Sequence, residues 1–338
     1  MKKSILFLIG FYISINLLGQ TKIDSLIQQG INYHDAGDYA RAIEFYKQAL
    51  ALDPNNSTAN YEIAYSYMLA KDYENSIKYS DIVIKLDQQN AVSAYITKGS
   101  SLDYLGKTEE SIKLFEKAIK KYGDNYLLYY NLGYDYYSLN NKEKAEKALI
   151  NAIQTKSNHT SSHLLLAQLM ANQNKNVQSL LGLYYFLFLE PNTDRSKTAM
   201  KLLEKQFGGN VQKDKDKPDQ INITFNSDQI DSEFGAASMM LSMMEASNSI
   251  EENKDKSKDQ LFIENTTSFF KILGELKDQK KKGFWWDFYV SFFYDLANSD
   301  HMDTFCYYIT QSTRESSNDW LQKNDPKIVM FDQWLKNK

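Results

Sequence analysis

Small and large residues recur at a fixed interval through the first half of this chain. Five small residues stand 34, 35, 34 and 34 positions apart, and these are Gly30, Ala64, Gly99, Gly133 and Ala167. A larger side chain follows each of them after three residues, and these are Tyr33, Tyr67, Leu102, Tyr136 and Met170. Residues three apart share one face of an α-helix. Each unit is therefore predicted to begin with a helix in which the small residue lets a neighbouring helix approach closely and the larger side chain on the same face fills the space beside it.

A second helix is predicted in each unit from another recurring set. The shared small residue is Ala42, Ser76, Ser111, Ala145 or Ser179, and the residue four positions later is Tyr46, Ser80, Phe115, Leu149 or Leu183. A further small position holds Ala49, Val83, Ala118 and Ala152, whereas the fifth unit has Phe186 there. The large ring at this place indicates that the last helix packs differently and meets the next domain.

One unit carries nearly a complete family motif: Gly30, Tyr33, Gly37, Tyr39, Ala42, Tyr46, Ala49 and Pro54. It resembles the tetratricopeptide repeat (TPR), a helical hairpin of about 34 residues. The resemblance implies an all-α fold with about five repeats stacked as a right-handed concave solenoid over residues 23–207, in which residues 193–207 close the array. Pro54 and Pro191 end equivalent repeats, whereas Gln88 and Gly123 replace the proline in repeats two and three, which leaves the ends of those repeats open.

A smaller helical domain is predicted after the repeats. Residues 208–222 include the charged segment KDKDKPD and read as a linker, and residues 223–338 form the second domain. Amphipathic runs place helices near Gln229–Ser247, Asp259–Lys277, Phe284–Asn298, Asp300–Gln311 and Pro326–Lys336, with Asp228, Asp300 and Asp325 as N-caps. The aromatic segment Gly283–Leu296 is expected to be the centre of this domain's core, while the β-prone run Ile221–Phe225 stays unassigned.

The N-terminus has the order of a signal peptide. Lys2 and Lys3 precede an apolar run, Ile5–Leu18, after which the chain becomes polar. We expect cleavage after Gly19, so that residues 1–19 are removed and the body is exported to the periplasm or cell surface without insertion in the membrane. The bulky Leu17 near the cleavage site keeps an uncleaved N-terminal anchor as the alternative. The arrangement is similar to exported bacterial TPR proteins with a C-terminal helical extension, which implies no catalytic residues.

Composition narrows the possible partners. With 39 Lys and Arg against 43 Asp and Glu, the formal charge of −4 offers no cationic field for a phosphate backbone, so nucleic acid is not expected as a partner. The single cysteine, Cys306, cannot form an internal disulfide, and it is expected to be a buried, unmodified thiol.

Several candidate chemical sites have a simpler structural interpretation. His159 and His163 have the spacing of paired zinc ligands, but they lack the accompanying glutamate and a third ligand. His301 with Asp303 and Cys306 lies in an apolar run that reads as core. Two other segments have equally simple readings: DKDKPD lacks the glycine and glutamate of a calcium loop, and SMMLSMMEA at 238–246 reads as core filling rather than a methionine-lined groove. The sequence therefore predicts no catalytic residue, no metal site and no cofactor.

The resemblance to TPR proteins also implies where a partner would bind. In that family the concave groove is lined by particular positions of each first helix, and here those positions hold Tyr61, Tyr65, Tyr104, Tyr130, Tyr134 and Tyr137. Tyr33, Tyr67 and Tyr136 fall at the core position instead. The groove lacks the set of Lys, Arg and Asn with which carboxylate-clamp TPR proteins hold a chain terminus, so no clamp activity is expected. The alternative is that several of these rings pack against neighbouring helices or the second domain.

The function predicted from these features is a non-catalytic scaffold of the cell envelope that binds a peptide segment or partner protein. Two other functions stay open at this stage. One is an enzyme or enzyme subunit with an unrecognised site in the C-terminal domain, and the other is a self-assembling structural protein whose repeat ends stack between chains. The sequence identifies neither the partner nor the oligomeric state.

Overall fold

The computed structural model describes residues 20–208, 211–213, 221–223, 233–247, 255–277 and 281–338. These residues are helical apart from one short two-stranded ladder, which confirms the predicted all-α solenoid class. The chain divides into two compact units, one up to Thr155 and one from Lys156 onward. The predicted signal peptide, residues 1–19, lies outside the described residues.

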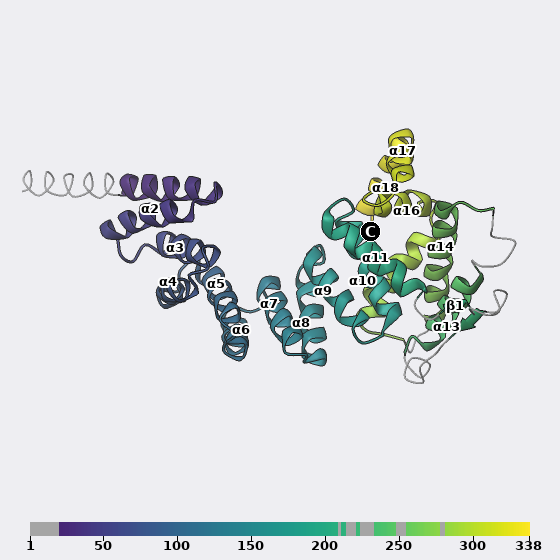
Figure 1. Ribbon diagram of the computed structural model, residues 1–338, viewed down its shortest axis with the longest axis horizontal. Helices are drawn as coiled ribbons and strands as arrows, with labels where there is room; N and C mark the ends of the chain where they lie inside the picture. The colour runs from purple at the N-terminus through teal and green to yellow at the C-terminus, as the bar shows by residue number, and fades with distance from the viewer. Residues whose placement is uncertain (1–19, 209–210, 214–220, 224–232, 248–254, 278–280) are drawn as a thin grey trace, which may run out of the picture. The chain divides into compact units, whose positions relative to one another are not determined.

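The first unit is a series of four helical hairpins, which run from purple to teal in Figure 1. Residues 20–35 form its first helix. The helices that follow are α2 (Tyr39–Leu52), α3 (Ser57–Leu69), α4 (Tyr73–Leu86), α5 (Ala91–Tyr104), α6 (Thr108–Tyr122), α7 (Tyr126–Ser138) and α8 (Lys142–Thr155). From α2 onward, each helix packs against the next one along the chain. Each predicted repeat of this unit is therefore one hairpin.

The small residue in the first helix of a repeat meets the large residue in the second. A Cβ atom added to Gly30 would lie 2.3 Å from the Tyr46 ring, and one added to Gly99 would lie 2.1 Å from the Phe115 ring. Distances this short exclude a side chain, because real Cβ contacts are essentially never below 3.0 Å. The glycines are therefore required where an aromatic ring fills the hairpin. The second repeat differs, because both positions hold small, buried residues, Ala64 in the first helix and Ser80 in the second.

The turn inside each repeat depends on one residue with a positive φ angle. Seven positions after the recurrent small residue, φ lies between 56° and 79° in all five repeats. These residues are Gly37, Lys71, Gly106, Asn140 and Asn174. Glycine and asparagine adopt this left-handed conformation at low cost, whereas the lysine is unusual there. The turn geometry is thus preserved even where the amino acid changes.

The second unit begins with the fifth repeat. Its described elements are α9 (Thr160–Ala171), α10 (Asn176–Leu189), α11 (Asp194–Gly208), β1 (Val211–Lys213), β2 (Ile221–Ile223), α13 (Gly235–Ser247), α14 (Lys258–Leu276), the π-helix η2 (Trp285–Val290), α15 (Ser291–Ala297), α16 (Met302–Thr310), α17 (Glu315–Lys323) and α18 (Asp325–Lys336). Strands β1 and β2 are antiparallel, with Gln212 opposite Asn222. The boundary between compact units therefore precedes the fifth repeat, whereas the sequence placed a linker at residues 208–222.

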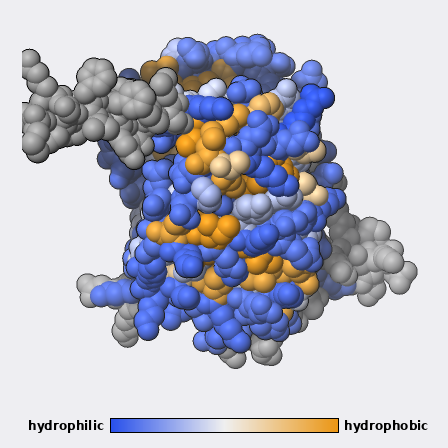
Figure 2. Space-filling model, turned by 90° about the vertical axis from the view of Figure 1, so that its left-hand side faces the viewer, coloured by the Kyte–Doolittle hydropathy of each residue, from blue (hydrophilic) through white to orange (hydrophobic). Residues whose placement is uncertain are grey.

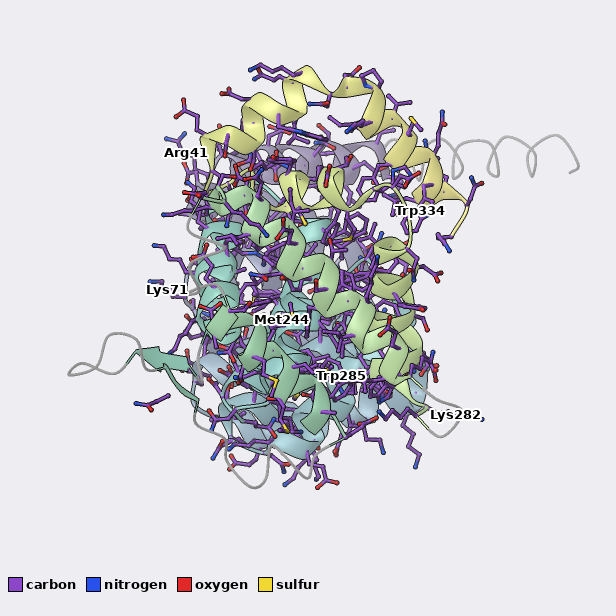
Figure 3. All side chains as sticks on the ribbon, turned by 90° about the vertical axis from the view of Figure 1, so that its right-hand side faces the viewer. Arg41, Lys71, Met244, Lys282, Trp285 and Trp334 are labelled. Carbon is purple, nitrogen blue, oxygen red and sulfur yellow. The ribbon has the colours of Figure 1, made fainter. Side chains whose placement is uncertain are left out.

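Helix α10 is the centre of the second unit's core. Tyr184 on this helix is fully buried, with its ring centroid 4.9 Å from Phe270, 6.1 Å from Phe293 and 6.4 Å from Phe305. Phe270 and Phe293 are stacked on each other at 4.3 Å. These contacts confirm that the last repeat helix meets the C-terminal helices and that the aromatic segment lies in their core. In Figure 3 the labelled side chains Met244, Trp285 and Trp334 come from α13, η2 and α18 of this unit.

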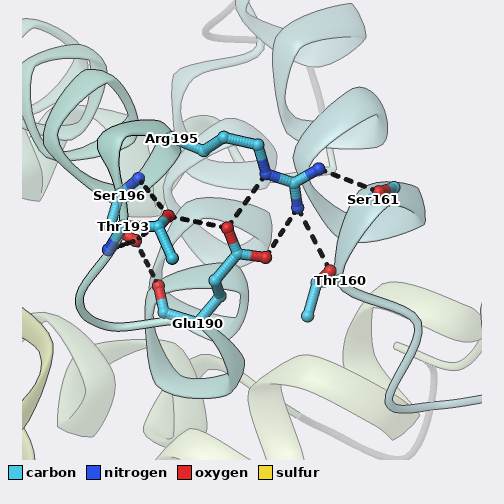
Figure 4. A network of polar contacts seen from close by, with 6 residues as sticks. All are labelled: Thr160, Ser161, Glu190, Thr193, Arg195 and Ser196. Atoms are coloured by element: carbon cyan, nitrogen blue, oxygen red, sulfur yellow. Dashed lines mark hydrogen bonds and ion pairs between the residues drawn. The ribbon is translucent and has the colours of Figure 1, made fainter. Parts of the chain in front are cut away.

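A polar network holds the turn after α10, where Pro191 ends the repeat (Figure 4). The Arg195 guanidinium donates to both carboxylate oxygens of Glu190, at 2.9 and 2.7 Å, and also to the hydroxyls of Ser161 and Thr160 on α9. Its charged carbon lies 5.3 Å from the centroid of the Phe186 ring. Because all the guanidinium's partners belong to the fifth repeat and its closing turn, the network is structural.

Several details differ from the sequence expectations. The five predicted C-terminal helices are present, but α17 was missed; it is short and mostly polar, and only Ser317 in it is buried. The N-caps of α16 and α18 are His301 and Asn324, so the predictions of Asp300 and Asp325 were each wrong by one residue. Asp228 lies outside the described residues.

Candidate peptide-binding groove

The first helices of neighbouring repeats form the inner layer of the first unit. Within residues 20–155, α3 contacts α5 and α5 contacts α7, although each of these pairs is separated by a complete helix in the sequence. Helices that approach each other in this way line the narrower, concave side of a stacked array. The six predicted groove tyrosines all lie on α3, α5 and α7.

None of these six tyrosines belongs to the buried core. Tyr104 has an exposed fraction of 64% and Tyr134 one of 44%. The remaining four are half-buried: Tyr61, Tyr65, Tyr130 and Tyr137. The residues expected in the core behave differently, since Tyr136 is buried and Tyr33 and Tyr67 are partly buried against core residues. Exposure therefore distinguishes Tyr104 and Tyr134 from the buried Tyr136, whereas Tyr33 and Tyr67 are half-buried like the other four groove tyrosines. Partner binding by the six tyrosines stays a prediction.

One end of the groove carries a short stack of rings. The Tyr61 and Tyr65 rings are parallel, 6.2 Å apart, and the His34 ring stacks on Tyr65 at 5.1 Å. His34 Nδ1 also lies 2.7 Å from the Ser66 hydroxyl. Burial lowers the pKa of His34, although the neighbouring Asp35 carboxylate opposes this change, so the ring is favoured in its neutral form.

His34 is a groove residue that the sequence analysis missed. It lies four residues after Gly30, just as Tyr137 lies four residues after Gly133. The repeat register therefore assigns His34 to a groove position.

A pocket of about 250 Å³ opens between α5 and α7 in the same layer. Its lining residues are Ser100, Asp103, Tyr104, Phe115, Tyr130, Asn131, Tyr134 and Asp135. The exposed rings of Tyr104 and Tyr134 lie at its rim, whereas Phe115 and Asp135 are buried and form its base. Three of the predicted tyrosines are thus brought to one cavity.

The carboxyl group of Asp135 is unusual for a repeat helix. Its exposed fraction is only 2%, and its Oδ2 atom has no hydrogen-bond partner. Burial raises the pKa of Asp135 to about 7, and the negative charge of Asp103 contributes to this rise. The nearby Ser111 hydroxyl opposes the rise, but its geometry is too poor for a full hydrogen bond, because its Oγ is also without a partner.

The histidine pair at 159 and 163 is part of the framework of the second unit. His163 is fully buried, with Nδ1 2.6 Å from the Tyr289 hydroxyl and Nε2 2.8 Å from the Ser157 carbonyl oxygen. Both ring nitrogens therefore have protein partners, and burial lowers the pKa of His163 to about 4. Among the described residues, no cluster of three or more His, Cys, Asp or Glu side chains could hold a metal ion.

The other candidates from the sequence are Cys306, His301 and the methionine segment 238–246, and the structure shows how each is packed. Cys306 is buried, as expected, and burial raises the pKa of its thiol. The His301 ring packs 5.8 Å from both Phe331 and Trp334. The core assignment of the methionine segment was wrong in part, because Met243 has an exposed fraction of 58%.

Comparison with known proteins agrees with the repeat geometry. Two tetratricopeptide-repeat family models match the chain, one at residues 33–95 and the other at residues 96–176. Residues 33–176 are therefore tetratricopeptide repeats. Both matches lie within residues 23–207, where the 34-residue period predicts the repeats. The matched residues include α3, α5 and α7, which carry the six tyrosines.

Each of the relatives matches only part of the chain. The chain is 25% identical to the TPR repeat-containing protein MJ1428 of Methanocaldococcus jannaschii, over 38% of its own length and 22% of that protein. It is 27% identical to human serine/threonine-protein phosphatase 5, over 29% of its own length and 20% of that protein. A solved structure, the thermophilic TPR protein TTC0263 of Thermus thermophilus, has 16% identity and a TM-score of 0.46, and the match covers 54% of this chain and 98% of that one. The chain thus spans about a fifth of the length of the curated relatives it matches.

The surface of the protein is mixed in character. Figure 2 shows hydrophobic residues on one face as patches separated by hydrophilic residues. In the part of the chain that the structure describes, no helix is both long and apolar enough to cross a membrane.

Proposed function

We propose that this TPR protein is a non-catalytic scaffold of the cell envelope that binds an extended peptide segment of a partner protein along α3, α5 and α7. The observation that carries the proposal is the exposure of the Tyr104 and Tyr134 rings on the inner layer. Burial of an exposed ring under a partner contributes favourably to the binding free energy, and the tyrosine hydroxyl can still form hydrogen bonds at the edge of the interface.

Tyrosine also suits this role energetically. The side chain has two rotatable χ angles, so ordering it on binding costs little entropy for the area that it supplies. The Tyr61, Tyr65 and His34 stack already holds its rings in place before a partner arrives. A pre-ordered aromatic surface favours an extended peptide, whose backbone and side chains can follow the row of first helices.

The non-catalytic part of the proposal agrees with the general role of TPR repeats as protein-interaction scaffolds. The runner-up, an enzyme or enzyme subunit with a site in the second unit, predicts a substrate-dependent turnover that depends on C-terminal residues. A self-assembling protein would instead give a concentration-dependent increase in mass, which light scattering of the purified chain measures directly.

The envelope location is proposed from the N-terminal sequence. The basic Lys2 and Lys3 followed by the apolar run support export, and cleavage after Gly19 would leave Gln20 as the first residue. N-terminal sequencing of the protein isolated from its own cells tests this. A soluble cytoplasmic protein that starts at Met1 would contradict it.

The binding function is tested by a triple replacement of Tyr65, Tyr130 and Tyr134 with alanine. We expect capture of the partner from an envelope extract to be lost, while the helical circular-dichroism signal and the melting temperature stay nearly unchanged. A matched control is Tyr129→Ala, because Tyr129 is also half-buried and adjoins Tyr130 on α7 but falls outside the groove positions. A large fall in melting temperature for the triple variant would assign these rings to the core instead.

A further inference from the structure

The pocket between α5 and α7 has the composition of a receptor for one positively charged side chain. We propose that it binds an arginine side chain of the peptide held in the groove, with the guanidinium between the tyrosine rings at the rim and the carboxylate of Asp135 at the base. This inference rests on the proposed peptide-binding function, and it adds the chemistry of one required partner residue.

The base of the pocket supplies an unsatisfied acceptor. Asp135 has an exposed fraction of only 2%, and Oδ2 has no donor in the folded chain. A buried acceptor without a donor is costly, and the cost is greater for a charged group. A guanidinium inserted from the groove would provide both the missing donor and the opposite charge.

A second carboxylate strengthens the preference for a cation. Asp103 lines the pocket from α5 and accepts one hydrogen bond, at 2.7 Å from the Thr108 hydroxyl, through Oδ1. No lysine, arginine or histidine is among the residues that line this pocket. The two carboxyl groups therefore line the cavity without a basic side chain of the pocket wall beside them.

The rim supplies aromatic faces. Tyr104 and Tyr134 are exposed and Tyr130 is half-buried, and all three line the same cavity. A cation near the face of such a ring is attracted by its quadrupole, and arginine is favoured because its planar group stacks on rings and is less strongly hydrated than an ammonium. The Tyr104 ring is also held in place, since it stacks on Tyr73 at 5.0 Å.

The size of the pocket fits a single side chain. Sites for drug-sized ligands occupy roughly 300–1,000 Å³, and this cavity of about 250 Å³ is smaller. It opens on the face where the other predicted groove tyrosines lie, so a peptide could continue on both sides of the inserted arginine.

The direct test uses the chain from Gln20 onward with ¹³C-labelled tyrosine rings and the probe N-acetyl-arginine amide. The single variants Tyr104→Phe, Tyr130→Phe and Tyr134→Phe assign the three ring signals. We expect arginine amide to shift these signals in a saturable way, whereas the neutral citrulline analogue of the same shape leaves them in place. Asp135→Asn should weaken the affinity at least tenfold. The control Asp300→Asn removes one exposed acidic charge in the second unit and should leave the affinity unchanged.

Several results would overturn the inference. They are the absence of ring shifts with arginine amide, equal shifts with the citrulline analogue, or equal affinity in Asp135→Asn and the unchanged protein. Shifts produced by calcium chloride and not by arginine amide would show a metal site instead. The proposed function is tested separately: if the triple tyrosine variant loses its partner but Asp135→Asn retains it, the groove binds a peptide that has no arginine in this pocket.

Discussion

Replacing Asp135 with asparagine should make the unfolding free energy of the first unit less dependent on pH. Folding transfers this carboxyl group from water to the base of the pocket, where burial raises its pKa from the ordinary 3.8 to about 7. Between these two values the folded state holds a proton that the unfolded state has lost. The contribution of Asp135 is therefore most favourable at low pH, and it is lost as pH rises toward 7 and beyond.

The size of the effect follows from the same two values. At about 1.4 kcal/mol for each pH unit, raising the pH from 5 to 8 should cost roughly 2.5 kcal/mol of unfolding free energy. Because the pocket opens to solvent, water reduces this figure, and we expect about 2 kcal/mol. Asparagine has nearly the same shape and carries no charge, so the variant should lose much less stability over this range and be the more stable protein at pH 8.

Guanidinium unfolding at pH 5 and pH 8 measures the difference. All four tryptophans, at positions 285, 286, 320 and 334, belong to the second unit, so tryptophan fluorescence reports that unit alone. Unfolding of the first unit appears as the part of the circular-dichroism change that fluorescence does not follow. Parallel pH dependence in Asp135→Asn and the unchanged protein would refute the reasoning, since it would mean that the carboxyl group is as well solvated when folded as when unfolded.

Three further predictions concern packing and titration elsewhere. Gly99→Ala should destabilise the first unit by about 1–3 kcal/mol because the new methyl would lie 2.1 Å from the Phe115 ring, and Gly133→Ala should cost less because the nearest atom there, Leu149 Cγ, is 2.8 Å away; equal unfolding midpoints would contradict this. His163 should stay neutral in the folded state down to about pH 4, so the second unit should lose up to ~3 kcal/mol as pH falls from 7 to 4; a tryptophan-detected midpoint that is constant over this range would exclude the effect. Cys306 should react with a thiol reagent many times more slowly in the native protein than after denaturation, because the thiol is buried and its pKa is raised; equal rates would show that α16 is turned toward solvent.

The repeats could be predicted because their packing rule is local. A glycine in one helix and a large ring in the next are always the same number of residues apart, as Gly30 with Tyr46 and Gly99 with Phe115 show. The shared turn conformation was harder to recognise, because Lys71 has a positive φ angle although lysine gives no signal for it. Backbone geometry here is imposed by the neighbouring helices rather than by the residue.

The site was only partly accessible from the sequence. The repeat register placed Tyr104 and Tyr134 on the inner layer, where the structure shows their rings exposed. It gave no indication of the pocket, because an aspartate in a helix reads as a solvated residue until its neighbours are known. Asp135 is buried where α5 approaches α7, and these two helices are separated in the sequence by the whole of α6.

The domain boundary shows the same limit. The fifth repeat carries the repeat pattern, but α10 is apolar on all sides and contributes Tyr184 to the core of the C-terminal helices. Phe186, which replaces the small residue of the other repeats, indicates that this helix packs differently. The repeat pattern does not indicate to which compact unit the helix belongs. The compact units divide at Thr155 and Lys156, before this helix, and the linker at residues 208–222 stays a prediction.

The most direct test of the account is to locate the partner on the first unit by photo-crosslinking. A benzophenone side chain introduced at Tyr134 would report contacts of the inner layer, and the same group at Lys117, an exposed residue of α6, would report the outer layer. If the partner binds in the tyrosine groove, it is crosslinked from position 134 and not from position 117. Crosslinking from position 117 alone would contradict it, because the partner would then bind the outer helices and not the tyrosine groove.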